Sequence, residues 1–314
     1  MRNWLTERFE LTVPVIGAPM AGPGEGALAA AVSAGGGLGM IGVNASRDAG
    51  WVAAQADLAG AGGQRFGIGL MAWALESRPE QLDAAVAAGP ALVSVSFGDF
   101  EPHVTRLKEA GIAVTTQAGN LDEALRAERA GVDLVVARGA EAGGHGRDEV
   151  GTLPLLQTVL EHVTVPVVAA GGIAGPRGLA AVLAAGAVGA WVGTAFLGCP
   201  EAGNTSAARR ALFAATDAGT SYGRVFDVAQ QLPWPPEFGG RGLRNTYFDT
   251  WSDRLDELAH DDAAAEQLRA ARADEDFDTA YLYAGQGVGL LREERPASDV
   301  LADFARAAEL LKRF

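Results

Sequence analysis

The sequence contains very little cysteine: Cys199 is the single thiol among 314 residues. One thiol excludes an internal disulfide framework and suits a reducing compartment, so we expect a cytoplasmic protein. Cys199 could act as a nucleophile, but residues 198–201 supply no base to activate it. This favours a structural or incidental thiol.

Positive charge and long apolar runs are also scarce. Lys and Arg total 25 against 39 Asp and Glu, a net charge of −14, which repels a phosphate backbone and argues against nucleic acid as a partner. A phosphorylated ligand would therefore be held by backbone amides and helix ends. No stretch reaches about 18 uninterrupted apolar residues, and residues 1–10 lack a signal-peptide core. We expect a soluble protein without membrane association.

The sequence is rich in hydrophobic residues and glycine. Hydrophobic residues make up 48%, charged residues 20%, and glycine occurs 42 times. This composition supplies a sizeable core and is not that of a disordered chain. Most glycines lie between periodic segments, as many short turns between strands and helices require.

Short apolar segments alternate with helical patterns along the first 200 residues. We expect strands at 13–17, 38–41, 66–71, 92–95, 112–116, 133–137, 165–169 and 188–192, and helices at 25–34, 47–58, 79–88, 101–110, after the N-cap Asn120, 153–162 and 176–185. About eight such units close an α/β TIM (β/α)8 barrel. A doubly wound sheet is the alternative, but its phosphate-binding glycines normally follow the first strand, whereas the strongest glycine runs here follow the sixth to eighth.

The pattern changes after the eighth strand. Helical patterns return at 207–215 and 253–272, and residues 232–242 form an irregular loop with aromatic side chains. We expect a barrel over 1–200, a helical cap inserted after strand 8 over 201–290, and a C-terminal segment, 291–314, that packs on the barrel. Residues 296–314 are expected to form one amphipathic helix.

The glycine–histidine loop, residues 138–148 (RGAEAGGHGRD), directly follows the sixth strand. Its glycines allow positive φ and close approach to a ligand, His145 adds an imidazole that can donate or accept a proton, and Glu141 adds a carboxylate. Taken alone, the loop could be a sharp turn with a surface histidine. Two further glycine runs, 169–175 and 191–196, also end strands, and three strand ends in succession favour a ligand site at the carboxyl face of the barrel.

Two glycine pairs could bind a phosphate. Gly171 and Gly172 follow strand seven, and Gly193 and Thr194 follow strand eight. They offer backbone amides and a hydroxyl to a phosphate dianion, and the helix opening near Pro176 adds its positive end. The alternative is that these glycines serve packing.

Several of these motifs resemble the nitronate monooxygenase family, formerly called 2-nitropropane dioxygenases. They are residues 18–22 (APMAG), 31–39 (AVSAGGGLG), 139–145 (GAEAGGH), 169–173 (AAGGI), 192–196 (VGTAF), 239–245 (GGRGLRN) and 283–290 (YAGQGVGL). The resemblance implies a TIM barrel with bound FMN and no metal. It also implies oxidation of alkyl nitronates by O2 to a carbonyl compound and nitrite.

The resemblance also implies roles for individual residues. His145 would be the catalytic histidine beside the flavin. The phosphate positions would be Gly143, Gly144, Gly171, Gly172, Gly193 and Thr194, the loop against the isoalloxazine would be Ala18, Pro19 and Met20, and Gln117 would bring an amide near the ring. From the irregular loop we expect Trp234, Phe238 and residues 241–245 to line or close the substrate cavity.

Two positions depart from the family pattern. Gly69 stands where many relatives have asparagine, and Arg138 stands where glutamine is usual, so both are expected to affect substrate choice more than FMN binding. One alternative function is an FMN- and NAD(P)H-dependent enoyl-thioester reductase, against which residues 18–22 favour the monooxygenase. A second is a non-catalytic FMN or phosphate-ligand binding protein, against which the intact His145 argues. No sequence pattern specifies an oligomeric state or the physiological nitronate.

Overall fold

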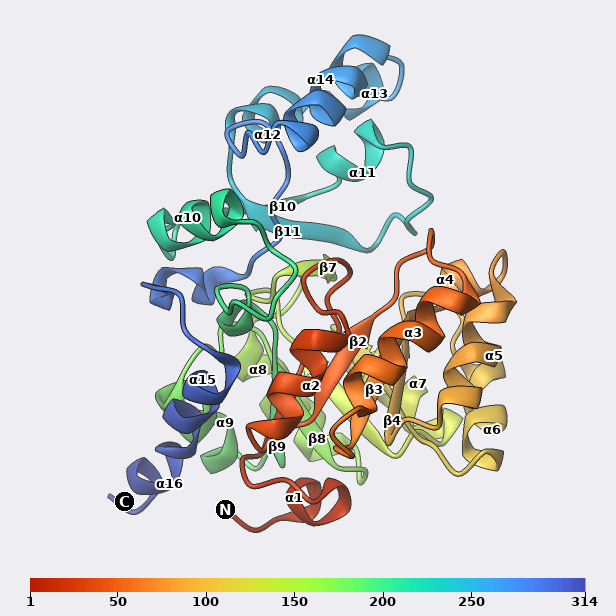
Figure 1. The fold of residues 1–314 in the computed structure, drawn as a ribbon, viewed down its shortest axis with the longest axis vertical. Helices are drawn as coiled ribbons and strands as arrows, with labels where there is room; N and C mark the ends of the chain where they lie inside the picture. Colours follow the sequence, from red (N-terminus) through yellow and green to blue (C-terminus); the bar gives the residue numbers. More distant parts are fainter. Residues whose placement is uncertain (314) are drawn as a thin grey trace.

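Eight parallel strands form a barrel in the computed structural model, which describes residues 1–313 (Figure 1). The strand order is β1-β9-β8-β6-β5-β4-β3-β2. The ring closes between β1 and β2 through a parallel bridge from Ile16 to Leu38, where the Gly17 amide donates to the Leu38 carbonyl at 2.8 Å. The barrel strands are β1 (Val15–Gly17), β2 (Gly39–Gly42), β3 (Phe66–Met71), β4 (Leu92–Ser96), β5 (Ala113–Ala118), β6 (Leu134–Arg138), β8 (Val167–Ala170) and β9 (Gly189–Val192).

Helices surround the strands, and the predicted (β/α)8 architecture is confirmed. They are α2 (Gly26–Ala34), α3 (Ala49–Gly60), α5 (Pro79–Ala88), α6 (Glu101–Glu109), α7 (Leu121–Ala130), α8 (Thr152–His162) and α9 (Pro176–Ala184). Asn120 caps α7 as predicted, since its side chain accepts from the Glu123 amide at 3.0 Å. A short helix that the sequence did not predict, α4 (Ala72–Leu75), follows β3.

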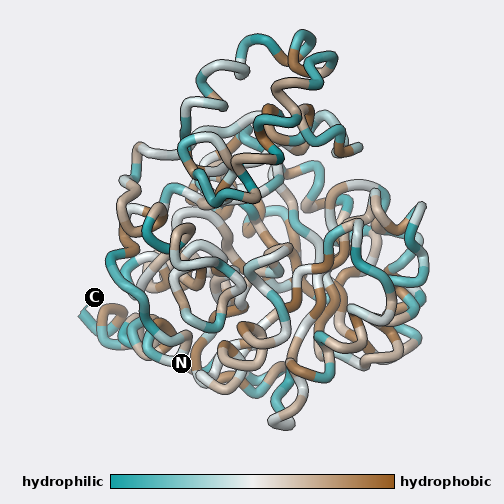
Figure 2. The backbone as a smooth tube through the Cα atoms, turned by 45° about the horizontal axis from the view of Figure 1, so that its top comes forward, coloured by the Kyte–Doolittle hydropathy of each residue, from teal (hydrophilic) through white to brown (hydrophobic). Residues whose placement is uncertain are grey.

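Two apolar layers explain why the strands are almost continuously hydrophobic. Leu92 and Leu134 point into the barrel, and the next residues, Val93 and Val135, pack outward against the helices. The tube view shows hydrophobic segments gathered in the middle of the barrel and hydrophilic ones at the outer turns (Figure 2). A further helix that was not predicted, α1 (Trp4–Phe9), closes the end of the barrel away from the cap with the fully buried Leu5.

The cap contains its expected helices and also a sheet that was not expected. The expected helices are α10 (Ser206–Ala214) and, over 253–272, α13 (Leu255–Leu258) and α14 (Asp262–Ala273). Helices α11 (Val225–Ala229) and α12 (Thr246–Trp251) and the 3₁₀ turn η2 (Gln286–Leu290) were not predicted, and a further 3₁₀ turn, η1 (Thr194–Phe196), follows β9 before the cap begins. The helical stretch expected at 253–272 is divided, because the Asp261 side chain caps α14 by accepting from the Ala264 amide.

An antiparallel sheet joins the cap to the barrel in the order β10-β11-β7. Strands β10 (Thr220–Gly223) and β11 (Gly239–Leu243) belong to the cap, and β7 (Gly144–Gly146) lies within the glycine–histidine loop. The expectation of an irregular chain as far as residue 242 was therefore wrong from Gly239 onward. The paired strand supplies the hydrogen bonds that stabilise this glycine-rich segment.

The C-terminal segment forms two helices, so the single helix expected at 296–314 was wrong. Helix α15 (Ala297–Ala305) packs against α2, α9 and η1, and α16 (Ala307–Leu311) packs mainly against α9. A single residue, Arg306, separates the two helices, and Leu301 and Phe304 of α15 are fully buried. Across residues 1–313, no helix combines the length and apolar character needed to cross a membrane.

Candidate active site

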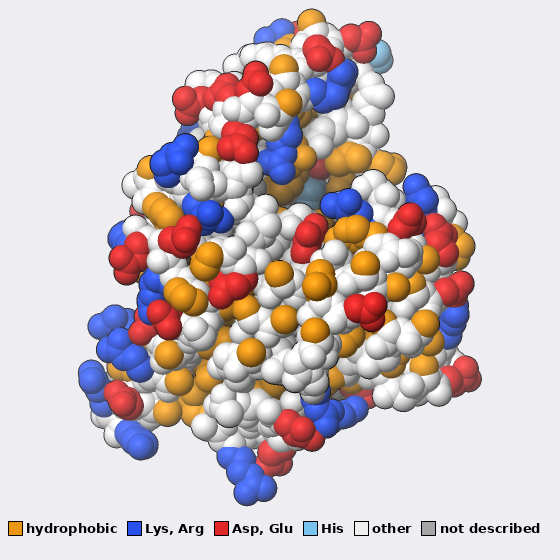
Figure 3. Space-filling view, in the orientation of Figure 1, with side chains coloured by type: hydrophobic (Ala, Val, Ile, Leu, Met, Phe, Trp, Pro, Cys, Tyr) orange, Lys and Arg blue, Asp and Glu red, His pale blue; other side chains and the backbone are white. Residues whose placement is uncertain are grey.

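A cavity of about 610 Å³ lies at the carboxyl ends of the barrel strands, beneath the cap. In the space-filling view a hollow opens between cap and barrel, and a histidine side chain lies inside it (Figure 3). The structure brings every residue of the predicted site to this one cavity, although their individual roles remain predictions. They are Ala18, Pro19, Met20, Gln117, Gly143, Gly144, His145, Gly171, Gly172, Gly193 and Thr194.

One end of the cavity offers free backbone donors. Within residues 1–313, the amides of Gly172, Gly193 and Thr194 donate to no protein acceptor, while the Thr194 hydroxyl accepts from the Gly285 amide at 3.0 Å. Gly171 and Gly172 have φ values of 116° and 68°, which other residues rarely adopt. Unpaired amides on such a backbone fit a phosphate group.

The loop at residues 18–20 lies very close to β3. A Cβ atom added to Gly69 would lie 2.4 Å from the Pro19 ring, so an asparagine at position 69 would force this loop to move. Glycine at position 69 therefore allows Pro19 to pack directly on β3. On β5, Gln117 lines the cavity, and its backbone N–H donates to the Ser96 hydroxyl at 3.1 Å.

Arg138 braces the glycine–histidine loop from inside the protein. The residue is 4% exposed, and its Nη2 donates to the carbonyls of Gly143 at 3.1 Å and Gly144 at 3.0 Å. No carboxylate in residues 1–313 forms an ion pair with it. Burial lowers the pKa of the guanidinium to about 10, so Arg138 remains a cation at neutral pH.

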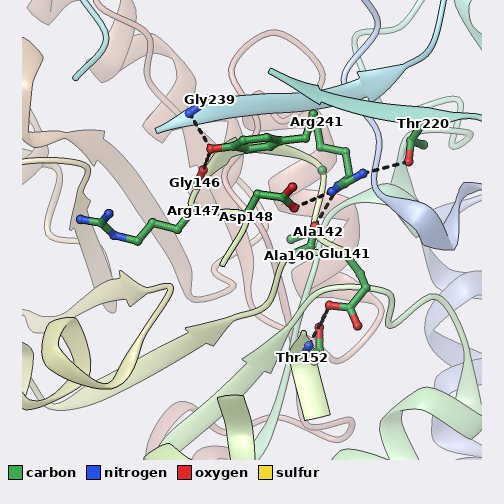
Figure 4. Close-up of polar contacts among 12 residues, drawn as sticks. Ala140, Glu141, Ala142, Gly146, Arg147, Asp148, Thr152, Thr220, Gly239 and Arg241 are labelled. Atoms are coloured by element: carbon green, nitrogen blue, oxygen red, sulfur yellow. Dashed lines mark hydrogen bonds and ion pairs between the residues drawn. The ribbon is translucent and has the colours of Figure 1, made fainter. Parts of the chain in front are cut away.

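Contacts from the cap hold the loop from the other side (Figure 4). Arg241 donates to the Ala140 carbonyl at 2.8 Å and to Asp148 at 2.6 Å. The Tyr222 hydroxyl donates to the Gly146 carbonyl at 2.8 Å. Glu141 accepts from the amide and hydroxyl of Thr152 at 2.7 and 2.6 Å, so this carboxylate serves the loop's structure.

Of the cap residues that were predicted to line or close the cavity, only Trp234 lines it, together with Leu232 of the same loop. Phe238 does not line the cavity and instead packs on the ring of Phe97, with centroids 5.5 Å apart. Residues 241–245 do not line the cavity, because Arg241 turns toward the glycine–histidine loop and Asn245 caps α12 by accepting from the Phe248 amide. Their positions are fixed by the sheet and helix that begin there.

His145 lies on β7, and cap residues hold its ring. Its Nε2 lies 2.8 Å from Oδ1 of Asp227, which is on α11 and 1% exposed. The Trp234 ring stacks on the imidazole with centroids 3.7 Å apart and planes 2° apart. The Tyr283 ring lies 5.1 Å away, and burial together with the Asp227 carboxylate raises its pKa well above the usual value.

Sequence reasoning missed Asp227 and Tyr283. The signal for Asp227 was one acidic residue in an otherwise apolar stretch, 225–229 (VFDVA), since a carboxylate in such a run needs a polar partner if it is buried. Tyr283 opens one of the family-like motifs, but nothing in its spacing placed its ring beside the histidine.

Known proteins resemble the chain over nearly its whole length. The nitronate monooxygenase family profile matches residues 68–306. Nitronate monooxygenases from Paraburkholderia phytofirmans and Pseudomonas aeruginosa are each 32% identical to it, covering 96% and 95% of this chain and 94% and 97% of their own.

Two solved structures share the complete fold. FabK from Thermotoga maritima has a TM-score of 0.85 at 27% identity, covering 100% of this chain and 98% of its own. Nitroalkane oxidase from Streptomyces ansochromogenes has a TM-score of 0.82 at 31% identity, covering 98% and 99%. The GAEAGGH motif lies at the cavity, as expected for this family. The profile match and the sequence similarities show that the chain belongs to the nitronate monooxygenase family, whose members are flavin-dependent monooxygenases.

Proposed function

We propose that the protein binds FMN in the cavity beneath the cap and oxidises alkyl nitronates with O2 to a carbonyl compound and nitrite. The observation that carries the proposal is the position of His145 in the same cavity as the unpaired amides of Gly172 and Gly193. These amides would hold the FMN phosphate, and the loop of Ala18, Pro19 and Met20 would lie against the ring system. The family relationship supports a flavin as the cofactor.

Bound FMN would supply the redox chemistry, accepting electrons from the nitronate and returning them to O2. The chain's own residues would bind, orient and enclose the substrate. A protonated His145 would hold the anionic nitro group by a charge-assisted hydrogen bond. Trp234 and Tyr283, both beside His145 at the cavity wall, would keep water from the reacting atoms.

The test measures anaerobic reduction of the FMN-loaded protein by stopped-flow absorbance. An alkyl nitronate should bleach the flavin within the time of turnover, and admission of O2 should restore the colour and release nitrite. Absence of bleaching by any nitronate, with FMN bound at about one per chain, would refute the proposed reaction.

An FMN- and NAD(P)H-dependent enoyl-thioester reductase gives the opposite result in the same apparatus. It would be bleached by NADPH, would oxidise NADPH in step with an added enoyl thioester, and would ignore nitronates. A non-catalytic binding protein would respond to neither reductant. The curated relatives at 32% identity over nearly the full length favour the nitronate reaction.

A further inference from the structure

The contacts on His145 restrict both the direction of its ring and the position of its proton. Trp234 lies flat on the imidazole, with planes 2° apart, and so opposes tilting of the ring. The 2.8 Å contact from Nε2 to Asp227 opposes rotation within the ring plane. Asp227 is itself fixed on α11, where its carbonyl accepts from the Leu232 amide, and its side chain is almost fully buried.

The partner of Nε2 determines the tautomer. An ionised carboxylate can only accept hydrogen bonds, so in the neutral imidazole the proton lies on Nε2 and Nδ1 carries the free lone pair. Tyr283 is a second donor to this carboxylate. Burial and the neighbouring carboxylate raise its pKa well above the usual value, so its hydroxyl stays protonated, 3.5 Å from the same carboxylate oxygen.

We propose that Asp227 is a positioning residue that fixes the tautomer and orientation of His145, so that Nδ1 removes a proton from substrate carbon. The proposal rests on the proposed function and extends it to neutral nitroalkanes. In this step the C–H bond of the nitroalkane breaks, its proton forms an N–H bond at Nδ1, and the C–H electron pair passes to the nitro group. The products are a nitronate and an imidazolium ion beside the Asp227 carboxylate.

The charge of the pair favours proton removal over simple anion binding. A carboxylate 2.8 Å from the imidazole offsets much of the positive charge that an imidazolium would present to a nitronate. The same carboxylate stabilises the imidazolium as it forms, which assists proton uptake.

The first test compares a nitroalkane with the nitronate of the same carbon skeleton, nitroethane and ethylnitronate, in FMN-loaded wild type and Asp227→Asn. The asparagine keeps the shape, but its amide can donate to Nε2 and so stabilise the opposite tautomer. We expect kcat/KM for nitroethane to fall at least about a hundredfold, as for loss of an oriented general base, and kcat/KM for ethylnitronate to change only a few-fold. Asp249→Asn is the matched control, because it makes the same chemical change at an exposed cap carboxylate.

Equal losses for the two substrates would overturn the proposal, because they would mean that Asp227 supports only the structure. A wild-type protein that is bleached by ethylnitronate but not by nitroethane would overturn proton removal while leaving the proposed function intact. Absence of bleaching by either substrate would instead refute the proposed function.

The second test observes the histidine directly and requires no activity. The chain has four histidines, so side-chain ¹⁵N NMR of histidine-labelled protein is tractable, and the signal that disappears in His145→Asn identifies His145. We expect the Nε2–H tautomer in the wild-type protein and a shift toward Nδ1–H in Asp227→Asn. An Nδ1–H tautomer in the wild type would overturn the proposal, and this result stands even if the Asp227 variant fails to fold.

Discussion

Replacing Arg138 with methionine tests whether this buried cation stabilises the whole fold or only the loop that carries His145. The two shorter hydrogen bonds, to the Gly143 and Gly144 carbonyls at 3.1 and 3.0 Å, are charge-assisted and contribute about 1.5–3 kcal/mol each, or about 3–6 kcal/mol together. Burial lowers the pKa to about 10, which is about 2 to 3 pH units below the ordinary value. That drop corresponds to about 3–4 kcal/mol against the folded state.

The two contributions nearly cancel, so we expect Arg138→Met to lower the free energy of unfolding by about 0–3 kcal/mol. The local effect should be larger, because two partly buried carbonyls in the loop lose their arginine donor. Urea denaturation measures the first quantity, and hydrogen exchange of peptides covering residues 139–147 measures the second. Arg106→Met, at an exposed arginine of α6, is the control. A loss of more than about 5 kcal/mol, or unchanged exchange in the loop, would refute this reasoning.

Three further predictions concern ligand binding and turnover. His145→Asn should retain FMN but lower kcat/KM for nitronates roughly a hundredfold, because it loses a charge-assisted contact worth about 2–3 kcal/mol. Equal rates of flavin bleaching in the variant and the wild type would contradict a catalytic role for His145. Gly193→Leu should lose FMN without unfolding, because the leucine side chain would enter the cavity beside Met20. Flavin absorbance measures the bound FMN and circular dichroism measures the fold, and a variant that retains FMN at the wild-type ratio would contradict the phosphate assignment. Trp234→Ala should raise oxygen consumption relative to nitrite formed, because it removes the ring stacked on His145 and opens the cavity wall; unchanged coupling would mean that Trp234 does not exclude water.

The sequence predicted the barrel well because each strand is a short apolar run between turn residues. All eight expected strands lie within a few residues of the observed ones. The missed α1 has only six residues, too few for a helical period to be distinguished, and its Leu5 and Phe9 are held by the barrel interior. The break at Arg306 was missed for a related reason. No glycine or proline marks it, so the sequence carries no signal that ends the helix there.

The site was predicted at the level of loops, because glycine runs at strand ends are visible in the sequence. The contacts around His145 were not predicted, because they join residues from three distant segments. Asp227 is 82 residues from His145 along the chain, and strands β7, β10 and β11 are rich in glycine, which has low strand propensity. Their pairing depends on the tertiary structure, and a one-residue shift of β11 would have been equally compatible with its sequence.

The sheet between cap and barrel makes the geometry of His145 a property of both parts. Strand β7 has three residues, too short to be stable alone, so its conformation depends on pairing with β11 of the cap. We propose that residues 1–200, 201–290 and 291–314 form barrel, cap and C-terminal segment, with this sheet crossing the first boundary. A rigid opening of the cap would break the β7–β11 pairing and separate His145 from Asp227 at once. Substrate is therefore expected to enter by movement of the chain around Trp234, between α11 and β11, while the sheet stays paired.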